Sequence, residues 1–257
     1  EHGESLAVRL LEPEAPRRGL AELGLDAEDE AALRRVIRAG DGLVLVTGPT
    51  GSGKTTTLYS TLKYLAAPDV NIVTVEDPIE FIHQDALSSV SQREVGIDTP
   101  GFAHALRAAL RQDPDVILVG EIRDEETMDI GLKAAETGHL VLSTLHTPDV
   151  ARTIGRVLAL SGQSVQETRE RFADNLKAIV AQRLIPAAEG GLCLAAEVLV
   201  VTGTARESLR KPEGNPSLKD IMERGSHPYM MQTFEMHLRE LVKQGRVTVE
   251  DAKNAMT

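Results

Sequence analysis

Short apolar runs alternate with longer amphipathic stretches through most of the chain. The runs are rich in valine, leucine and isoleucine, and we predict strands at 42–47, 71–75, 116–119 and 139–144. Apolar residues at helical spacing fill the intervals, and we predict helices at 27–39, 55–65, 102–111 and 125–137. Apolar strands separated by helices indicate a mostly parallel sheet that helices cover on both faces. The pattern therefore predicts an α/β fold.

The pattern differs at the two ends of this core. Residues 6–11 are typical of a strand, which cannot bury itself alone, so we interpret 1–12 as the terminal strand of a truncated N-terminal domain. Residues 13–26 are typical of a linker, and the α/β core is expected over 27–203. The remainder, 204–257, is expected to be a C-terminal helical region. Its helices are predicted at 204–210, 217–223, 230–244 and 249–256.

Composition excludes several classes of protein. The chain has 28 basic and 39 acidic residues, which argues against nonspecific DNA binding, so no nucleic-acid partner is expected. The single cysteine, Cys193, lies in an apolar run and is interpreted as a buried hydrophobic residue. One cysteine excludes a disulfide framework and a tetracysteine zinc site. Because no run is long enough to span a membrane and the start lacks signal-peptide features, we expect a cytoplasmic protein.

The most specific motif follows the strand at 42–47. It is Gly48-Pro49-Thr50-Gly51-Ser52-Gly53-Lys54-Thr55, which matches the phosphate-binding loop G-x-x-x-x-G-K-[ST]. Such a loop turns backbone N–H groups toward phosphates, and the helix N-terminus behind it adds its positive end. Lys54 is expected to reach the β- and γ-phosphates, and the Thr55 hydroxyl is expected to hold Mg²⁺. We therefore predict that residues 48–55, together with Thr56, bind a nucleoside triphosphate.

Acidic residues follow two of the later strands, at the edge where ligands bind in parallel sheets. Glu76, Asp77 and Glu80 come directly after the second strand, where they can orient water or hold a metal. A solvated turn is an equally good interpretation of that segment alone. Glu121 follows the third strand in the manner of a Walker B carboxylate that supports Mg²⁺.

Histidines lie at both ends of the last core strand. His139 and His146 are seven residues apart, so an extended strand separates them by about 23 Å and they do not share one metal. His146 comes at the carboxyl end and is therefore better placed to sense a γ-phosphate. Arg123 and Asp124, just after Glu121, are interpreted as a surface ion pair.

Taken together and in order, these motifs resemble the secretion-ATPase superfamily of type IV pilus and type II secretion motors. The resemblance covers nearly the whole chain. Besides the phosphate loop, it rests on the segments at 76–81, 92–96, 105–115, 119–124, 134–139 and 145–147. In that family the central motifs are called the Walker A, Asp box, atypical Walker B and His box. The resemblance implies a RecA-like P-loop core that hydrolyses ATP with Mg²⁺.

The resemblance also implies functions for individual residues. Glu80 takes the place of the catalytic glutamate, and Glu121 that of the residue that holds Mg²⁺ and the attacking water. Glu76 is placed in support of both. His146, with His139 as a weaker candidate, belongs to the phosphate-sensing element.

Family members form homo-hexameric rings at the cytoplasmic face of the inner membrane. In such a ring Arg9 matches a position that approaches the γ-phosphate of a neighbouring subunit. The implied partners are a second copy of the chain and an inner-membrane pilus platform protein, with pilin as an indirect partner.

Within the superfamily the chain is most similar to the PilT-type retraction ATPases. Extension and secretion motors commonly carry a tetracysteine zinc insert after the segment that matches 181–184, and this chain has none there. Further similarity lies at 231–234, Leu241, Gly245 and 250–252. Residues 205–210 depart from the retraction pattern, and 57–60 are more like the extension branch. The alternatives are therefore a pilus-extension, type II/IV secretion or DNA-transfer ATPase, and a nucleotide-gated regulatory subunit that does not hydrolyse.

Overall fold

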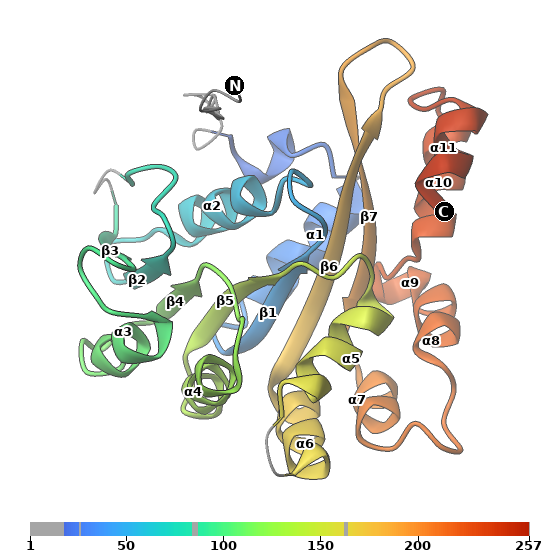
Figure 1. Ribbon diagram of the computed structural model, residues 1–257. Helices are drawn as coiled ribbons and strands as arrows, with labels where there is room; N and C mark the ends of the chain where they lie inside the picture. Colours follow the sequence, from blue (N-terminus) through green and yellow to red (C-terminus); the bar gives the residue numbers. More distant parts are fainter. Residues whose placement is uncertain (1–17, 26, 84–86, 162–163, 257) are drawn as a thin grey trace, which may run out of the picture.

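A seven-stranded sheet runs through the part of the chain that the structure describes (Figure 1). The computed structural model describes residues 18–256, except 26, 84–86 and 162–163. The strand order across the sheet is β3-β2-β4-β5-β1-β6-β7. In that order the strands span Ser89–Glu94, Asn71–Glu76, Val116–Val119, Leu140–Leu145, Gly42–Thr47, Leu176–Pro186 and Leu192–Val200. Neighbours pair in parallel except β6 and β7, so the carboxyl ends of β1 to β6 lie at one edge of the sheet.

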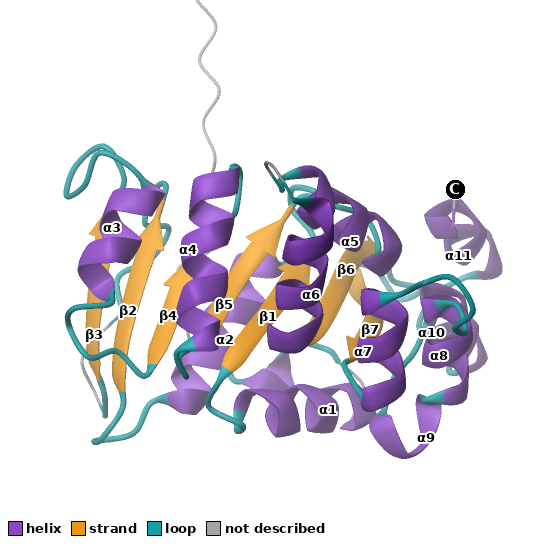
Figure 2. Ribbon diagram, turned by 90° about the horizontal axis from the view of Figure 1, so that it is seen from below, coloured by secondary structure: helices purple, strands orange, loops and turns teal. Residues whose placement is uncertain are grey.

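Helices cover both faces of this sheet (Figure 2). One face carries α1 (Ala27–Ile37) and α2 (Lys54–Leu65). The other carries α3 (Phe102–Ala109), α4 (Glu125–Glu136), α5 (Val150–Ala159) and α6 (Val165–Asn175). Within β1, Val44 and Val46 pack with the first group of helices, whereas Leu43 and Leu45 pack with the second. Because alternate side chains point to opposite faces, a strand with both faces covered must be apolar at every position.

The last helices pack beside the β6–β7 hairpin. They are α7 (Gly203–Arg210), α8 (Leu218–Arg224), α9 (Ser226–Tyr229), α10 (Phe234–Lys243) and α11 (Val249–Met256). α10 packs on β7 and α11 on β6, and a third apolar cluster forms between them. Cys193 is buried in that cluster, which confirms its interpretation as a hydrophobic residue. Among the described residues, no helix has both the length and the apolar character needed to cross a bilayer.

The core elements predicted from the sequence are confirmed, with small differences at their ends. The sequence does not predict β3, β6, β7, α5 or α6. The strand predicted at 6–11 lies outside the described residues. Within the predicted linker, Leu20 is buried in the core beside α1 and α2, so this part of the segment is packed structure.

The helix predicted at 230–244 is shorter than expected. Met230 has a left-handed backbone (φ 57°), which interrupts helical geometry. The Thr233 side chain then accepts a hydrogen bond from the N–H of Met236 and caps the start of α10. The helix therefore begins only at Phe234.

Candidate active site

The phosphate-binding loop joins the carboxyl end of β1 to α2, as predicted. Gly48 lies so close to β6 that an added Cβ would be 2.3 Å from the carbonyl oxygen of Gln182, so only glycine fits there. Gly53 has a left-handed backbone (φ 88°) at the start of α2. Lys54 follows and is buried, and its Nζ donates to the carbonyl oxygens of Gly48 and Pro49 at 2.8 and 2.9 Å. Its ammonium is thus held inside the curve of the loop.

A cavity of about 610 Å³ opens in front of this loop. The predicted residues that line it are Thr50, Gly51, Gly53, Lys54, Thr55, Thr56, Glu76, Glu80, Glu121 and His146. These residues are brought together because β1, β2, β4 and β5 all end at this edge of the sheet. Burial lowers the pKa of Lys54, and the nearby carboxylates of Glu121 and Glu80 act against that shift. Arg9 lies outside the described residues.

Glu76 is the most enclosed of the predicted acids, with 4% of its surface exposed. One carboxylate oxygen accepts from Thr74 Oγ1 at 2.6 Å and from Gln92 Nε2 at 3.1 Å. The other accepts from the hydroxyl of Tyr59 on α2. Burial and the neighbouring Glu76 carboxylate raise the pKa of Tyr59, so this hydroxyl stays protonated and donates. The arrangement suits Glu76 to a supporting position rather than to activating water.

Glu121 leaves the end of β4 with its carboxylate in the cavity. It forms an ion pair with Arg123, and its second oxygen is 3.5 Å from His146 Nε2. Arg123 also reaches Asp77 at 3.2 Å. The expected pair of Arg123 with Asp124 is therefore wrong, since Asp124 instead accepts from the N–H of Thr127 and caps α4.

His146 and His139 lie at opposite ends of β5. His146 lines the cavity, whereas the His139 ring is 3.0 Å from the carbonyl oxygen of Ala134 at the end of α4. Thr144 Oγ1 donates to the Gly120 carbonyl oxygen at 2.6 Å and ties the end of β5 to that of β4. Of the two histidines, only His146 is placed to contact a ligand in this cavity.

Thr55 and Glu121 face the same cavity and offer a hydroxyl and a carboxylate oxygen. Mg²⁺ prefers oxygen ligands and usually takes only one or two from the protein, with the rest from water and substrate phosphates. Among the described residues, no group of three or more histidine, cysteine or acidic side chains forms a metal cluster. The donor set therefore fits a magnesium ion that is shared with a phosphate ligand.

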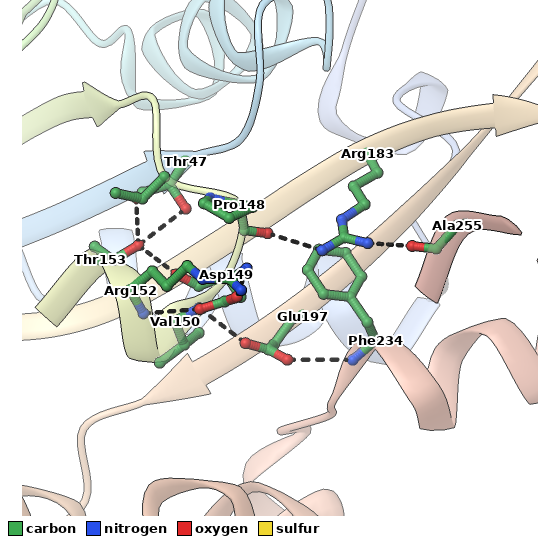
Figure 3. A network of polar contacts seen from close by, with 11 residues as sticks. Thr47, Pro148, Asp149, Val150, Arg152, Thr153, Arg183, Glu197, Phe234 and Ala255 are labelled. Carbon is green, nitrogen blue, oxygen red and sulfur yellow. Dashed lines mark hydrogen bonds and ion pairs between the residues drawn. The ribbon is translucent and has the colours of Figure 1, made fainter. Parts of the chain in front are cut away.

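A polar network connects the segment after His146 to the C-terminal helices (Figure 3). Glu197 on β7 accepts from the N–H of Val150 at 2.9 Å and from the N–H of Phe234 at 3.4 Å, so its carboxylate joins the N-termini of α5 and α10. Arg183 on β6 lies over the Phe234 ring at 4.4 Å and donates to the carbonyl oxygens of Pro148 and Ala255. The sequence offers one signal for this network, a lone acid inside the apolar run at 192–200.

Comparison with known proteins places the chain in a family. A family model described as type II/IV secretion system protein matches residues 1–256. The chain belongs to that family. It is 44% identical over 236 residues to the type IV pilus retractation ATPase PilT of Pseudomonas aeruginosa, a match that covers 91% of this chain and 67% of the relative. It is 42% identical over 235 residues to the type IV pilus assembly ATPase PilB of Myxococcus xanthus, covering 91% of this chain and 37% of the relative.

A solved structure supports the fold assignment. The crystal structure of the pilus retraction motor PilT with bound ADP is 42% identical, with a TM-score of 0.81, and the match covers 93% of this chain and 66% of that one. The chain thus spans about two thirds or less of the lengths of these relatives. The fold class predicted from the sequence, a mostly parallel α/β sheet followed by helices, is confirmed.

Proposed function

We propose that this chain is the ATPase core of a motor subunit that powers type IV pilus retraction, the disassembly of pilin from the pilus base. One observation carries the ATPase part of the proposal, and the similarity to PilT supports its place in retraction. Lys54, Glu80, Glu121 and His146 come from four separate segments and line a single cavity in front of the phosphate-binding loop. A binding-only module would not need carboxylates on the wall that faces the terminal phosphate.

In the proposed reaction Lys54 and the loop N–H groups bind the β- and γ-phosphates of ATP. Glu80 takes a proton from water as the water oxygen bonds to the γ-phosphorus. The bond from that phosphorus to the bridging oxygen of ADP breaks, and ADP and phosphate leave. His146, beside Glu121, contacts the γ-phosphate. The protein contributes mainly by positioning these groups and by stabilising charge.

Thr55 and Glu121 hold Mg²⁺ in this proposal. Charge balance supports a bound cation, because the cavity is lined by four carboxylates (Glu76, Asp77, Glu80 and Glu121) but by only one lysine and one arginine among the described residues. The magnesium ion would neutralise charge on the β- and γ-phosphates. Glu121 orients the attacking water from the same side.

We further propose that the subunits form a homo-hexameric ring at the cytoplasmic face of the inner membrane, where an inner-membrane platform protein links them to pilin. Arg9 then adds positive charge to the neighbour's γ-phosphate. Arginines supplied across an interface are worth about 10³–10⁵ in rate in other phosphoryl-transfer proteins. Specific activity should therefore rise steeply with protein concentration, and Arg9→Ala should remove most of that rise. Flat concentration dependence would overturn the trans-arginine assignment alone.

Substitution of Lys54 tests the nucleotide site. Lys54→Ala should abolish tight ATP binding in a nucleotide titration, because the charge that faces the phosphates is lost. Lys63→Ala, an exposed lysine on the same helix, is the matched control and should bind like the wild type. Glu121→Gln should keep binding and lose turnover by about 10²-fold or more. Retained micromolar affinity in Lys54→Ala would overturn the proposed site.

Pilus extension is the second candidate function, because the assembly ATPase PilB is nearly as similar to this chain as PilT is. The β6–β7 hairpin favours retraction, since residues 187–191 close it directly and leave no room for a zinc insert. Deletion of the gene decides between them. If the chain is a retraction motor, the deletion strain should keep surface pili that no longer power twitching. If it is an extension motor, the deletion strain should have no pili.

A further inference from the structure

The loop that carries Glu80 is held on both sides of that residue by strand β3. This Glu80 loop, residues 77–83, follows β2 and lies outside any helix or strand. Before Glu80, the N–H of Ile79 donates to Glu94 Oε2 at 3.0 Å. After Glu80, the carbonyl oxygen of Phe81 accepts from Gln92 Nε2 at 3.0 Å. The backbone on either side of the proposed catalytic carboxylate is thus bonded to β3.

Gln92 uses its whole amide group in this arrangement. Its two N–H groups donate to Phe81 and to the carboxylate of Glu76, at 3.0 and 3.1 Å. Its carbonyl oxygen Oε1 accepts from the N–H of His83 at 2.7 Å. One side chain therefore fixes the loop at two points and anchors it to the buried end of β2. Aspartate, leucine or lysine at this position would not offer two donors and one acceptor at the same reach.

The register of the sheet explains how Gln92 reaches these groups. Thr74 pairs with Gln92 and Glu76 pairs with Glu94 across β2 and β3. Because alternate residues share a face, these four side chains lie on the same side of the sheet. From that side Gln92 and Glu94 extend toward the end of β2, where the Glu80 loop begins. The hydroxyl oxygen of Tyr59 on α2, whose proton is donated to Glu76, also lies 3.2 Å from the carbonyl oxygen of Phe81.

We propose that Gln92 is a positioning residue for Glu80, with Glu94 as its counterpart on the other side of the loop. This inference rests on the proposed function and assigns a part to the segment at 92–96. A general base works only when its carboxylate lies within hydrogen-bond reach of the attacking water. Misplacement of a reacting group by about 1 Å costs about 10²-fold in rate. In this proposal the hydrogen bonds of Gln92 keep the backbone at Glu80 from shifting by as much as about 1 Å.

The test is a set of variants in the natural full-length protein. Gln92→Met removes every hydrogen bond of the amide at similar size. Gln92→Glu keeps the acceptor for His83 and loses both donors, so it serves as a second variant if the first folds poorly. Gln166→Met is the matched control, since Gln166 is exposed on α6 and its side chain donates to Glu170 in the same helix. The measurements are kcat, KM for ATP, ADP affinity and the melting temperature.

We expect both Gln92 variants to lower kcat about 10- to 100-fold while KM and ADP affinity stay within about twofold. A merely structural residue would lower the melting temperature and nucleotide affinity together with kcat. The decisive step is a double-mutant cycle with Glu80→Gln. If Gln92 acts through Glu80, Gln92→Met adds no further loss once Glu80 is already replaced.

Three outcomes would overturn the inference. They are a kcat within twofold of the wild type in both Gln92 variants, an equal loss of kcat and ADP affinity, and additive losses in the double-mutant cycle. These results are distinct from failure of the proposed function. That failure would appear as a wild-type protein without ATPase activity whose nucleotide binding does not respond to Lys54→Ala.

Discussion

The two loops that bring Glu80 and His146 to the cavity are held by different parts of the molecule. The Glu80 loop is bonded to β3 and α2, which lie close to it in the sequence. The segment after His146 is bonded instead to Arg183 on β6 and Glu197 on β7, and these two residues in turn bond to the last helices. Glu80, the proposed base, and His146, the proposed sensor, thus have separate anchors, and Arg123 links the two regions through Asp77 and Glu121.

Each loop is anchored by one buried carboxylate, but the donors differ in kind. In the part of the chain that the structure describes, the Glu76 carboxylate accepts from the side chains of Thr74, Tyr59 and Gln92. Glu197 accepts from backbone N–H groups at the N-termini of two helices, which are the ends that favour negative charge. Side-chain donors can be removed one at a time by substitution, whereas backbone donors cannot. We therefore expect single mutations to disturb the anchor of the Glu80 loop more than the anchor of the segment after His146.

The largest effect is expected at Glu80. Glu80→Gln should lower turnover by about 10²-fold or more, because an amide cannot take the proton from water, while nucleotide binding is kept. Steady-state hydrolysis and an ADP titration measure the two properties separately. Glu125→Gln, an exposed acid in the first turn of α4, is the matched control. Near-wild-type turnover in Glu80→Gln would show that the general base is another acid of the cavity.

The sequence predicts the centre of this fold better than its margins. The runs that form β1, β2, β4 and β5 are apolar at nearly every position because helices cover both faces. β3 has the sequence Ser-Val-Ser-Gln-Arg-Glu. It tolerates these polar residues because it is an edge strand and is only partly covered, and such a polar run does not predict a strand. β6 and β7 contain buried alanines at 178, 181, 195 and 196, a residue that is depleted in strands.

The site shows the same division. The phosphate loop is predictable because its glycines and lysine are required by local backbone geometry, and Glu121 and His146 because each ends a recognisable strand. Glu76 and Glu80 cannot be told apart in sequence, since only the folded structure shows that three side chains donate to the buried Glu76 carboxylate. Arg183 and Glu197 join segments that are distant in the chain, so no local pattern reveals their partners, although the lone acid in the apolar run at 192–200 marks Glu197.

A smaller effect is expected at His146. His146→Gln should lower turnover about tenfold, because a hydrogen bond to a charged group is worth about 1.5–3 kcal/mol and glutamine keeps a polar group at this place. His139→Gln is a matched control from the same strand, because His139 lies at the opposite end of β5 against α4. It should leave turnover unchanged. If His146→Gln loses as much turnover as Glu80→Gln, both residues act in the chemical step itself. The proposed difference in function between the two loops would then be wrong.

The smallest effect on turnover, and the clearest on stability, is expected at Glu197. Burial raises the pKa of this carboxyl group, while its two backbone hydrogen bonds act in the opposite direction. A carboxyl whose pKa is higher in the folded than in the unfolded state contributes stability below its unfolded pKa, near 4.5, and loses that contribution as the pH rises through the folded pKa.

Glu197→Gln has no such titration. It also turns an amide group toward backbone N–H donors, which leaves one donor unsatisfied at a cost of about 1–3 kcal/mol. We therefore expect the wild type to exceed Glu197→Gln in free energy of unfolding most strongly near pH 4.5, with the gap narrowing toward pH 8. Turnover should stay within about threefold, since the network acts on the His146 side and not on the base.

Denaturant unfolding at several pH values measures the gap in free energy of unfolding, and Glu189→Gln, an exposed acid in the β6–β7 turn, is the control. A gap of constant size across that pH range would show that the Glu197 carboxyl does not titrate differently on folding. A loss of turnover as large as that of Glu80→Gln would show that the two loops are not held independently.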